Sequence, residues 1–420
     1  MKHIVLNLIL SALITASSLA QETSVLFLGN SYTQTQNLPG TLYNLALAGG
    51  DTIYQESNTP GGYTLEGHST NATTLSKIAS RDWDFVVLQE QSQRPSFGEA
   101  QVAAQVYPFA EILVDSIRSN YQCTEPIFFM TWGRRDGDQQ NCAGFPALCT
   151  FEGMQERLRN AYLEMTFDND ATVAPCGAAW QQMALVNNTF WNGLYSGDGS
   201  HPSAWGTYLN ACVFYATILR KSPVGLDYYS SIGETDAVVL QQLAEDIVLD
   251  SLSSWNIGHA DVVADANFVN EGGSGLVDFS NSSVNATNHF WDFGDGNVSS
   301  LAAVSHNYSS AGTFEVQYIA SSACDSDTVT FEVSPSPNSI HENDLLDLVH
   351  VTQHGNRLFI KNALDEDVQL TVLDLMGRMI LRKTVKATSV EEIGLNQKTQ
   401  MYLLQFSAGN LQSTRKVFIQ

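Results

Sequence analysis

The chain has 420 residues, of which 44% are hydrophobic, so it is long enough for two or three domains with their own cores. Acidic residues outnumber basic ones by 44 to 20, which gives a formal net charge of −24 at pH 7. Phosphate binding requires clustered lysine and arginine, so this balance argues against nucleic acid as a partner. We interpret the acidity as favouring solubility outside the cell.

The first twenty residues have the layout of a cleavable secretory signal. Lys2 precedes an apolar stretch at residues 4–15, and Ser18-Leu19-Ala20 supplies small residues before Gln21. We predict cleavage after Ala20, which makes residues 1–20 the signal peptide. That stretch is too short to span a membrane comfortably, and no later stretch approaches a spanning length. The sequence therefore predicts a protein without a transmembrane span, secreted or held at the outer cell surface.

The chain contains six cysteines, and disulfides are common in exported proteins. Cys142 and Cys149 bracket a short loop that contains Gly and Pro, which predicts a local disulfide. Cys123 and Cys176 are a candidate second pair. Cys212 lies in an apolar helical run, where we expect a free buried thiol. No cysteine spacing resembles a zinc site.

Residues 21–260 alternate short apolar runs with amphipathic stretches, which is typical of a parallel sheet covered by helices. The predicted strands are residues 25–28, 52–56, 85–89, 127–131 and 172–174. The predicted helices are residues 38–48, 100–119, 151–165 and 208–219. In doubly wound sheets, ligands bind at the carboxyl ends of the strands, which is where Ser31 and Gln91 fall.

Ser31 follows the first predicted strand and is the candidate nucleophile. A serine hydroxyl attacks only when a base accepts its proton and a third group orients that base. Far downstream, Asp198-Gly199-Ser200-His201-Pro202 places an aspartate and a histidine three residues apart on a turn that enters a helix. One short segment can therefore present His201 as the base and Asp198 as the orienting group. The alternative is that Ser31 caps a helix and Asp198 forms only a turn.

Three blocks in this order resemble the SGNH (GDSL-like) hydrolase family over slightly more than half of the chain. They are Gly29-Asn30-Ser31-Tyr32-Thr33, where Asn30 replaces the more common aspartate, Pro60-Gly61-Gly62-Tyr63, and Asp198-Gly199-Ser200-His201-Pro202. The resemblance implies a three-layer α/β/α flavodoxin-like domain. It also implies that Ser31 attacks an ester, that His201 is the general base and that Asp198 orients it. This chemistry needs no metal or organic cofactor.

The resemblance further implies an oxyanion hole made by the backbone N–H groups of Ser31 and Gly62 and by one side-chain amide. Here the chain departs from the family, because Gly-x-Asn-Asp is replaced by Gln89-Glu90-Gln91-Ser92-Gln93. A glutamine carries the same amide donor on one more methylene. Its position at the strand mouth favours Gln91, whereas counting from the strand favours Gln93, so both are candidates.

Three further residues have a structural interpretation beside a functional one. Trp132 and Arg134 follow the fourth predicted strand and either line the substrate cleft or serve packing and the surface. His68 has no apparent carboxylate partner in the sequence, so we interpret it as structural or exposed.

Residues 261–334 change to Val-, Phe-, Ser- and Asn-rich alternation, which predicts a small all-β sandwich. The segment Trp291-Asp292-Phe293-Gly294-Asp295-Gly296, followed by Gly312-Thr313-Phe314, resembles the PKD-like immunoglobulin sandwich. We interpret Asp292 and Asp295 as turn-forming rather than calcium-binding. Such modules act as spacers or as contacts to glycans and proteins.

Residues 335–420 begin with a Ser/Pro linker and then alternate again, which predicts a small all-β domain. Residues 368–374, the turn Met376-Gly377-Arg378, residues 401–404 and the ending 416–419 resemble the C-terminal sorting domain of the type IX secretion system of Bacteroidetes-type bacteria. The resemblance implies that the export machinery is a partner and that the protein passes through the periplasm.

These features together predict a secreted or cell-surface serine esterase that acts on acetyl or similar acyl groups on carbohydrate. Export and the sandwich module suggest the glycan only by association. One alternative is a lipase-like or small acyl esterase. The other is a non-catalytic surface protein for glycan binding or adhesion. The reason to consider it is that this chain has glutamine where the resembling family has its oxyanion-binding asparagine.

Overall fold

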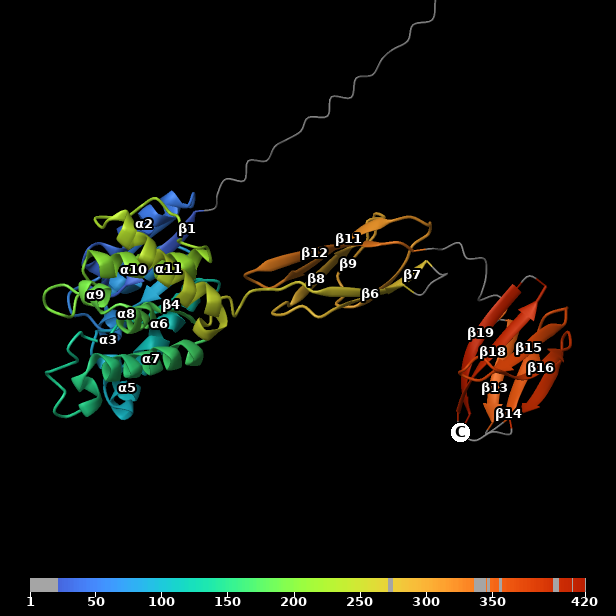
Figure 1. Cartoon of the computed structure of the whole chain (residues 1–420). Coiled ribbons are helices and arrows are strands. Elements are labelled where there is room, and N and C mark those ends of the chain that lie inside the picture. Colours follow the sequence, from blue (N-terminus) through green and yellow to red (C-terminus); the bar gives the residue numbers. More distant parts are fainter. Residues whose placement is uncertain are drawn as a thin grey trace, which may run out of the picture. The chain divides into compact units, whose positions relative to one another are not determined.

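The computed structural model describes residues 22–270, 275–335, 345, 348–354, 357–395, 400–409 and 411–419. The chain divides into two compact units, residues 1–260 and 261–420 (Figure 1). The predicted signal peptide, residues 1–20, and most of the predicted linker lie outside the described residues.

A parallel sheet with the strand order β2-β1-β3-β4-β5 forms the centre of the first unit. All of the predicted strands are present with small shifts at their ends, and β1 is buried along nearly its whole length, as expected for a strand covered on both faces. The order is that of flavodoxin-like sheets, so the predicted fold class is confirmed. The strands are β1 (Thr23–Leu28), β2 (Ile53–Asn58), β3 (Phe85–Leu88), β4 (Glu125–Phe129) and β5 (Thr172–Ala174).

Helices cover both faces of this sheet (Figure 1). α2 and α11 pack on α10, whereas α3 and α4 pack on α6, and right-handed crossovers place these groups on opposite faces. The α-helices are α1 (Ser31–Gln34), α2 (Leu38–Ala48), α3 (Leu65–Thr70), α4 (Ala72–Ile78), α5 (Glu99–Gln105), α6 (Tyr107–Asn120), α7 (Phe151–Asp168), α8 (Cys176–Val186), α9 (Asn188–Gly193), α10 (Ala204–Leu219) and α11 (Glu234–Val248). Short 3-10 turns are η1 (Arg94–Ser96), η2 (Pro146–Cys149) and η3 (Leu249–Trp255).

The single helix predicted over residues 100–119 is two helices, α5 and α6, separated at Val106. Val106 has φ −126° and ψ −59°, outside the helical range, and Pro108 stands in the first turn of α6. Proline has no N–H to continue a helix but is tolerated in a first turn. The prediction missed the break because the apolar spacing continues across it.

The direction in which strands are added reverses at β1, so the crevice between the carboxyl ends of β1 and β3 is the switch point of the sheet. Ser31 begins α1 just after β1, and Gln91 lies just after β3. The fold therefore brings both predicted residues to the edge where ligands bind in sheets of this order.

The cysteine predictions have mixed outcomes. Cys142 and Cys149 form the predicted disulfide, with their Cα atoms 4.7 Å apart, and Cys212 is free and buried as expected. The predicted pairing of Cys123 with Cys176 is wrong. Cys176 is a free thiol at the start of α8, packed in the core with its Sγ 4.0 Å from the carbonyl oxygen of Asn210.

The second unit begins with a sandwich of two antiparallel sheets, β10-β7-β6 and β12-β11-β8-β9. Trp291 and Phe293 are buried between them, while Asp292 and Asp295 accept backbone hydrogen bonds within the turn from Gly294 and Asn297, both at 3.0 Å. The strands are β6 (Ala266–Asn270), β7 (Leu276–Asn281), β8 (Asn288–Asp292), β9 (Val298–Ser299), β10 (Val304–Asn307), β11 (Phe314–Ser321) and β12 (Ser326–Val333).

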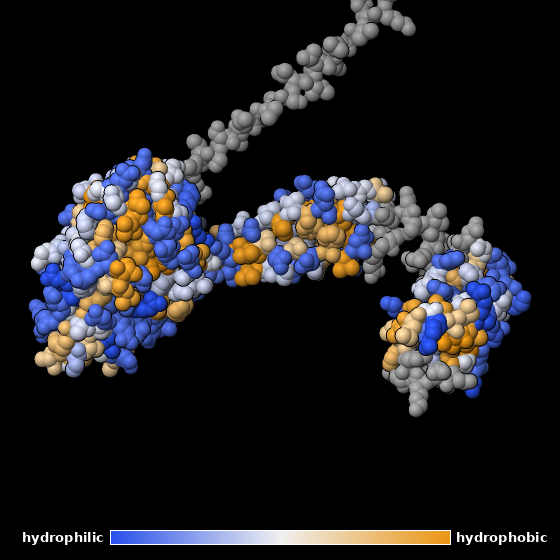
Figure 2. All heavy atoms as spheres, viewed as in Figure 1, coloured by the Kyte–Doolittle hydropathy of each residue, from blue (hydrophilic) through white to orange (hydrophobic). Residues whose placement is uncertain are grey.

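The remaining strands form two further antiparallel sheets, β13-β14-β17 and β16-β15-β18-β19, around a separate apolar core. On the visible face, the surface over each core is largely hydrophilic with smaller hydrophobic patches (Figure 2). The predicted all-β architecture after residue 260 is therefore confirmed. The strands are β13 (Val349–His354), β14 (Arg357–Asn362), β15 (Val368–Leu373), β16 (Met379–Val385), β17 (Val390–Gly394), β18 (Gln400–Ala408) and β19 (Leu411–Ile419).

Candidate active site

A chain of hydrogen bonds joins Ser31, His201 and Asp198. The Oγ atom of Ser31 lies 2.8 Å from Nε2 of His201, and Nδ1 of His201 lies 2.6 Å from Oδ2 of Asp198. A carboxylate only accepts hydrogen bonds, so Nδ1 carries the proton and Nε2 is left to accept from the serine hydroxyl. The structure thus brings together three predicted residues in the arrangement that activates a serine.

Asp198 holds both the histidine ring and the turn that carries it. Its Oδ1 atom accepts the backbone N–H groups of Ser200 and His201, each at 3.0 Å, while Oδ2 faces the imidazole. Partial burial raises the pKa of Asp198, but the hydrogen bonds from His201 and from these backbone groups outweigh it and lower the pKa. The turn-forming and the ring-orienting interpretations therefore apply to the same carboxylate.

The turn is fixed from outside as well. The backbone N–H of Ser196 donates to the carbonyl of His201 at 2.8 Å, and the N–H of Arg135 donates to the carbonyl of Gly199 at 2.9 Å. The indole Nε1 of Trp132 donates to the carbonyl of Ser200 at 3.1 Å. Because three separate donors hold the turn, His201 has little freedom to leave Ser31.

Stacked aromatic rings pack against this turn. Trp132 stacks on Trp180 with ring centres 4.0 Å apart, and Tyr32 stacks on Trp132 at 4.9 Å. The Tyr32 ring also meets the His201 ring edge-on at 5.2 Å, and its hydroxyl lies 2.6 Å from Oγ of Ser200. Of the two interpretations of Trp132, packing applies, because the side chain is fully buried. Sequence reasoning gave Tyr32 and Ser200 no role.

Asn30 connects the candidate nucleophile, Ser31, to the loop that contains Gly62. Its Oδ1 atom accepts the backbone N–H of Tyr32 at 3.0 Å and so caps α1, whereas its Nδ2 atom donates to the carbonyl of Tyr63 at 2.8 Å. An aspartate could form the cap but could not donate to a carbonyl. This second bond explains why asparagine suits a position where the resembling family has aspartate.

Gly62 lies in the loop between β2 and α3, with a positive φ of 67° that favours glycine. A side chain built there would meet nothing within 4 Å, so the requirement is one of backbone conformation and not of space. Gly62 is exposed, and the neighbouring contacts at Tyr63 and Leu65 set the position of the loop.

The two candidate glutamines differ in what their amide groups already bind. Nε2 of Gln91 donates to Oε1 of Gln93 at 3.1 Å, which uses one of its two N–H groups. Nε2 of Gln93 donates to Asp138 at 2.8 Å and to Gln140 at 3.3 Å, which uses both. Only Gln91 therefore retains an N–H that these bonds leave unused.

His68 is buried and structural, as the sequence interpretation held. Its Nδ1 atom lies 2.8 Å from Oγ1 of Thr74, and Nε2 lies 2.9 Å from the carbonyl oxygen of Gly29. Burial lowers the pKa of His68, so the ring is neutral and its Nε2–H donates to that carbonyl. His68 thereby fixes the backbone two residues before Ser31, a role for which the sequence carried no visible signal.

Polar side chains surround the buried carboxylate of Asp138 beside the site. Besides Gln93, it accepts from Asn141 at 2.7 Å and from Arg134 at 3.5 Å. Arg134 is near enough to the Tyr32 hydroxyl to lower its pKa, against the larger raising effect of burial. We call Gln91, Gln93, Arg134, Asp138 and Gln140 the polar rim.

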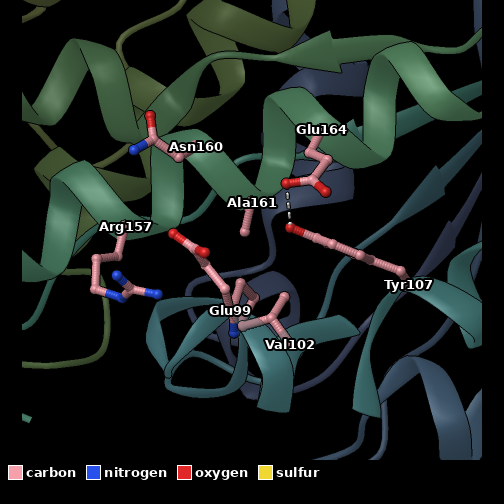
Figure 3. A pocket seen from close by; sticks show the side chains of 8 residues that line it. Glu99, Val102, Tyr107, Arg157, Asn160, Ala161 and Glu164 are labelled. Carbon is pink, nitrogen blue, oxygen red and sulfur yellow. Dashed lines mark hydrogen bonds between the residues drawn. The ribbon is translucent and has the colours of Figure 1, made fainter. Parts of the chain in front are cut away.

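A separate hollow lies between η1, α5 and α7 (Figure 3). Tyr107 donates a hydrogen bond to Glu164 across it at 2.8 Å, and Glu99 and Arg157 also line it. None of its lining residues belongs to the Ser31 site or to the polar rim.

Two family models match parts of the chain. The model described as a PKD domain matches residues 260–335, and the model described as a secretion system C-terminal sorting domain matches residues 355–420. Both predicted resemblances are confirmed. The sorting domain indicates export to the cell surface or beyond and implies interaction with the secretion machinery. Within the described residues, no helix combines the length and the apolar character that crossing a membrane requires.

Solved structures that resemble this chain include a DUF4886 family protein from Bacteroides uniformis, at 18% identity over 56% of this chain and 95% of that one, with a TM-score of 0.47. A candidate SGNH hydrolase from Slackia heliotrinireducens is 25% identical over 47% of this chain and 100% of its own, with a TM-score of 0.39. An acetyl xylan esterase is 15% identical over 46% and 99%, with a TM-score of 0.35. No curated protein matches the chain.

The description of the Slackia protein carries the family name that the sequence blocks predicted. All three TM-scores lie below 0.5, so any assignment of function depends on the geometry of the site itself.

Proposed function

We propose that the protein is an exported serine esterase with Ser31 as nucleophile. The observation that carries the proposal is the continuous hydrogen-bonded chain from Ser31 through His201 to Asp198 at the switch point of the sheet. Serine, neutral imidazole and carboxylate in this order form the arrangement used for acyl transfer.

The reaction proceeds in two halves. Oγ of Ser31 attacks the ester carbonyl carbon while Nε2 of His201 takes its proton, and Asp198 stabilises the imidazolium. The tetrahedral intermediate collapses, His201 returns the proton to the leaving alcohol, and an acyl-enzyme remains. Water then attacks with His201 again as base, which releases the carboxylic acid and restores Ser31.

The negative charge on the intermediate needs donors that are already in place. We assign this role to the backbone N–H groups of Ser31 and Gly62 and to the amide of Gln91. Gln91 is preferred to Gln93 because its Nε2 retains a free N–H, whereas both N–H groups of Gln93 are engaged. Each such donor contributes about a hundredfold or more to turnover.

The polar rim supports an acylated carbohydrate as the substrate. Amide, guanidinium and carboxylate groups suit the hydroxyl groups of a sugar, and Arg134 and Asp138 keep them ordered beside Tyr32. A long acyl chain would instead need an extended apolar lining. Export of the protein is consistent with a glycan outside the cell.

Hydrolysis of p-nitrophenyl acetate and p-nitrophenyl octanoate by the full chain tests the proposal. Ser31→Ala and His201→Ala should each lower kcat by at least about a thousandfold, since members of such a triad act as a unit. Ser80→Ala, at an exposed serine whose hydroxyl binds only the carbonyl of Lys77, is the control and should keep full activity.

A preference for acetate supports the deacetylase assignment, and a preference for octanoate supports the lipase-like alternative. A folded wild type that hydrolyses neither ester, or that is matched by both triad variants, would refute the esterase. It would favour a non-catalytic binding protein.

A further inference from the structure

Glu90 is a fully buried carboxyl group that the proposed mechanism does not use. It is the second residue after β3, between Gln89 and Gln91, and has no exposed surface. Burying a carboxylate costs free energy unless hydrogen-bond donors compensate it. The groups that it contacts therefore indicate what the residue does.

The Glu90 carboxylate joins two segments that are distant in sequence. Its Oε2 atom accepts the backbone N–H of Leu65 at 3.2 Å, and Oε1 accepts the backbone N–H of Gln91. Leu65 begins α3, directly after the loop that contains Gly62, and Gln91 opens the loop after β3. In the proposed function, these two segments supply two of the three oxyanion donors.

The Gly62 loop has few contacts of its own. Gly61 and Gly62 are exposed, and a Cβ on either would meet nothing within 4 Å. The residues on its C-terminal side hold it in position, through the bonds to Tyr63 from Asn30 and Asn71, both at 2.8 Å, and through the bond from Leu65 to Glu90. An oxyanion donor must be held within about half an ångström of its productive position.

We propose that Glu90 is a positioning residue whose ionised carboxylate clamps the Gly62 loop to the end of β3 and so sets the geometry of the oxyanion hole. The inference rests on the proposed function, because it assigns a role in the same reaction. An ionised carboxylate accepts strongly from both N–H groups at once, whereas in a protonated carboxyl one oxygen carries the hydrogen and is a weaker acceptor. The clamp is therefore complete only when Glu90 is charged.

Neighbouring groups act on this ionisation from three elements. Burial is the largest influence and raises the pKa of Glu90 to about 7, Arg94 of η1 favours the charge, and Glu66 of α3 opposes it. Tyr162 of α7 also faces the carboxyl. Because the pKa is raised above its unfolded value, the stability that Glu90 contributes is present at low pH and is lost as pH rises through about 7. The clamp forms as Glu90 ionises, over the same pH range in which this contribution to stability is lost. A residue that only supported the fold would stabilise it in the charged state, so the opposite trend distinguishes positioning from structural support.

The test compares Glu90→Gln with the wild type in the full chain, by kcat and KM for p-nitrophenyl acetate between about pH 5 and pH 9. Glutamine keeps the size and one acceptor oxygen but cannot ionise. We expect kcat at pH 8 to fall about ten- to a hundredfold while KM changes less than about threefold, since a displaced donor acts on the transition state. In the wild type, the acid limb of log kcat reflects two ionisations, those of Glu90 and of the general base His201. Glu90→Gln should remove the first, so that the limiting slope falls from two toward one.

Glu66→Gln is the matched control. It removes a negative charge from the same neighbourhood, but the Glu66 side chain is half-exposed and pairs with Arg94, not with Leu65 or Gln91. Its kcat at pH 8 should match that of the wild type, and its acid limb should keep both ionisations, shifted slightly to lower pH because one charge that opposes Glu90 is gone. Thermal unfolding at pH 8 should show that Glu90→Gln is no less stable than the wild type. If that variant does not fold, Glu90→Asp keeps the charge on a shorter stem and should lower kcat while retaining both ionisations.

Ser31-dependent hydrolysis with kcat and acid limb unchanged in Glu90→Gln would overturn the inference alone. An equal loss in Glu66→Gln would also overturn it, since the effect would then be one of general charge. Wild-type hydrolysis that does not depend on Ser31 would instead refute the proposed function and the inference together.

Discussion

Asn30 both caps α1, the helix that begins at Ser31, and holds the loop that contains Gly62. Its two side-chain atoms have opposite hydrogen-bonding requirements, because Oδ1 accepts from Tyr32 and Nδ2 donates to the Tyr63 carbonyl. Only an amide meets both. The departure from the aspartate of the resembling family is therefore compensated by a contact of this chain.

We predict that Asn30→Asp lowers kcat/KM about tenfold and the free energy of unfolding by about 1–3 kcal/mol, since a carboxylate would face the Tyr63 carbonyl without a donor. Esterase kinetics and urea unfolding measure the two effects. Asn30→Ser keeps a capping oxygen, but its shorter side chain has no amide N–H to donate to the Tyr63 carbonyl, so it should lose activity without the charge repulsion. An Asn30→Asp variant as active as the wild type would show that the bond to Tyr63 has no role.

At the level of elements, the segment after β4 carries Arg134, Asp138 and Gln140 of the polar rim and contains the disulfide between Cys142 and Cys149. Within it, the backbone N–H of Asp138 donates to the carbonyl of Leu148 at 2.7 Å, and the carboxylate of Asp138 receives Gln93. The disulfide therefore restrains the same loop that orders the rim.

Replacing both cysteines, as Cys142→Ser with Cys149→Ser, should lower the free energy of unfolding by about 2 kcal/mol, as expected for a short closed loop. Because the loop carries Asp138 and Gln140 of the rim but none of the triad and none of the proposed oxyanion donors, KM for an acetylated sugar should rise while kcat for p-nitrophenyl acetate stays near the wild-type value. Urea unfolding and kinetics on both substrates measure this. An unchanged KM for the sugar ester would show that this loop has no role in substrate binding.

The sequence predicted elements well where local pattern determines them. β1, β3 and β4 contain short continuous apolar runs, and α2 has the predicted bounds, Leu38–Ala48. The break between α5 and α6 escaped prediction because the apolar spacing continues through Val106. The bonds that join Asn30 to Tyr63 and Glu90 to Leu65 link segments far apart in the sequence, so no local pattern could reveal them.

Across the whole molecule, three separate apolar clusters form the cores of the α/β unit, the PKD-type sandwich and the sorting domain. The length and composition of the sequence predicted two or three domains. The boundaries at residues 260 and 334 stay predictions. The residue types and the order of the motif blocks were sufficient to select Ser31, Asp198 and His201 as candidates, because the proposed chemistry requires these residue types. The residues that support them, such as Tyr32 and His68, are identified only by their contacts.

Labelling of the full chain with a fluorophosphonate probe, with the adduct located by peptide mass spectrometry, bears most directly on the role of Ser31. An activated serine attacks the phosphorus and becomes covalently labelled, whereas an ordinary serine does not. We predict one adduct, on Ser31, and its loss in both Ser31→Ala and His201→Ala. A folded protein that stays unlabelled, or that carries the label on another serine, would contradict the assignment of Ser31 as nucleophile.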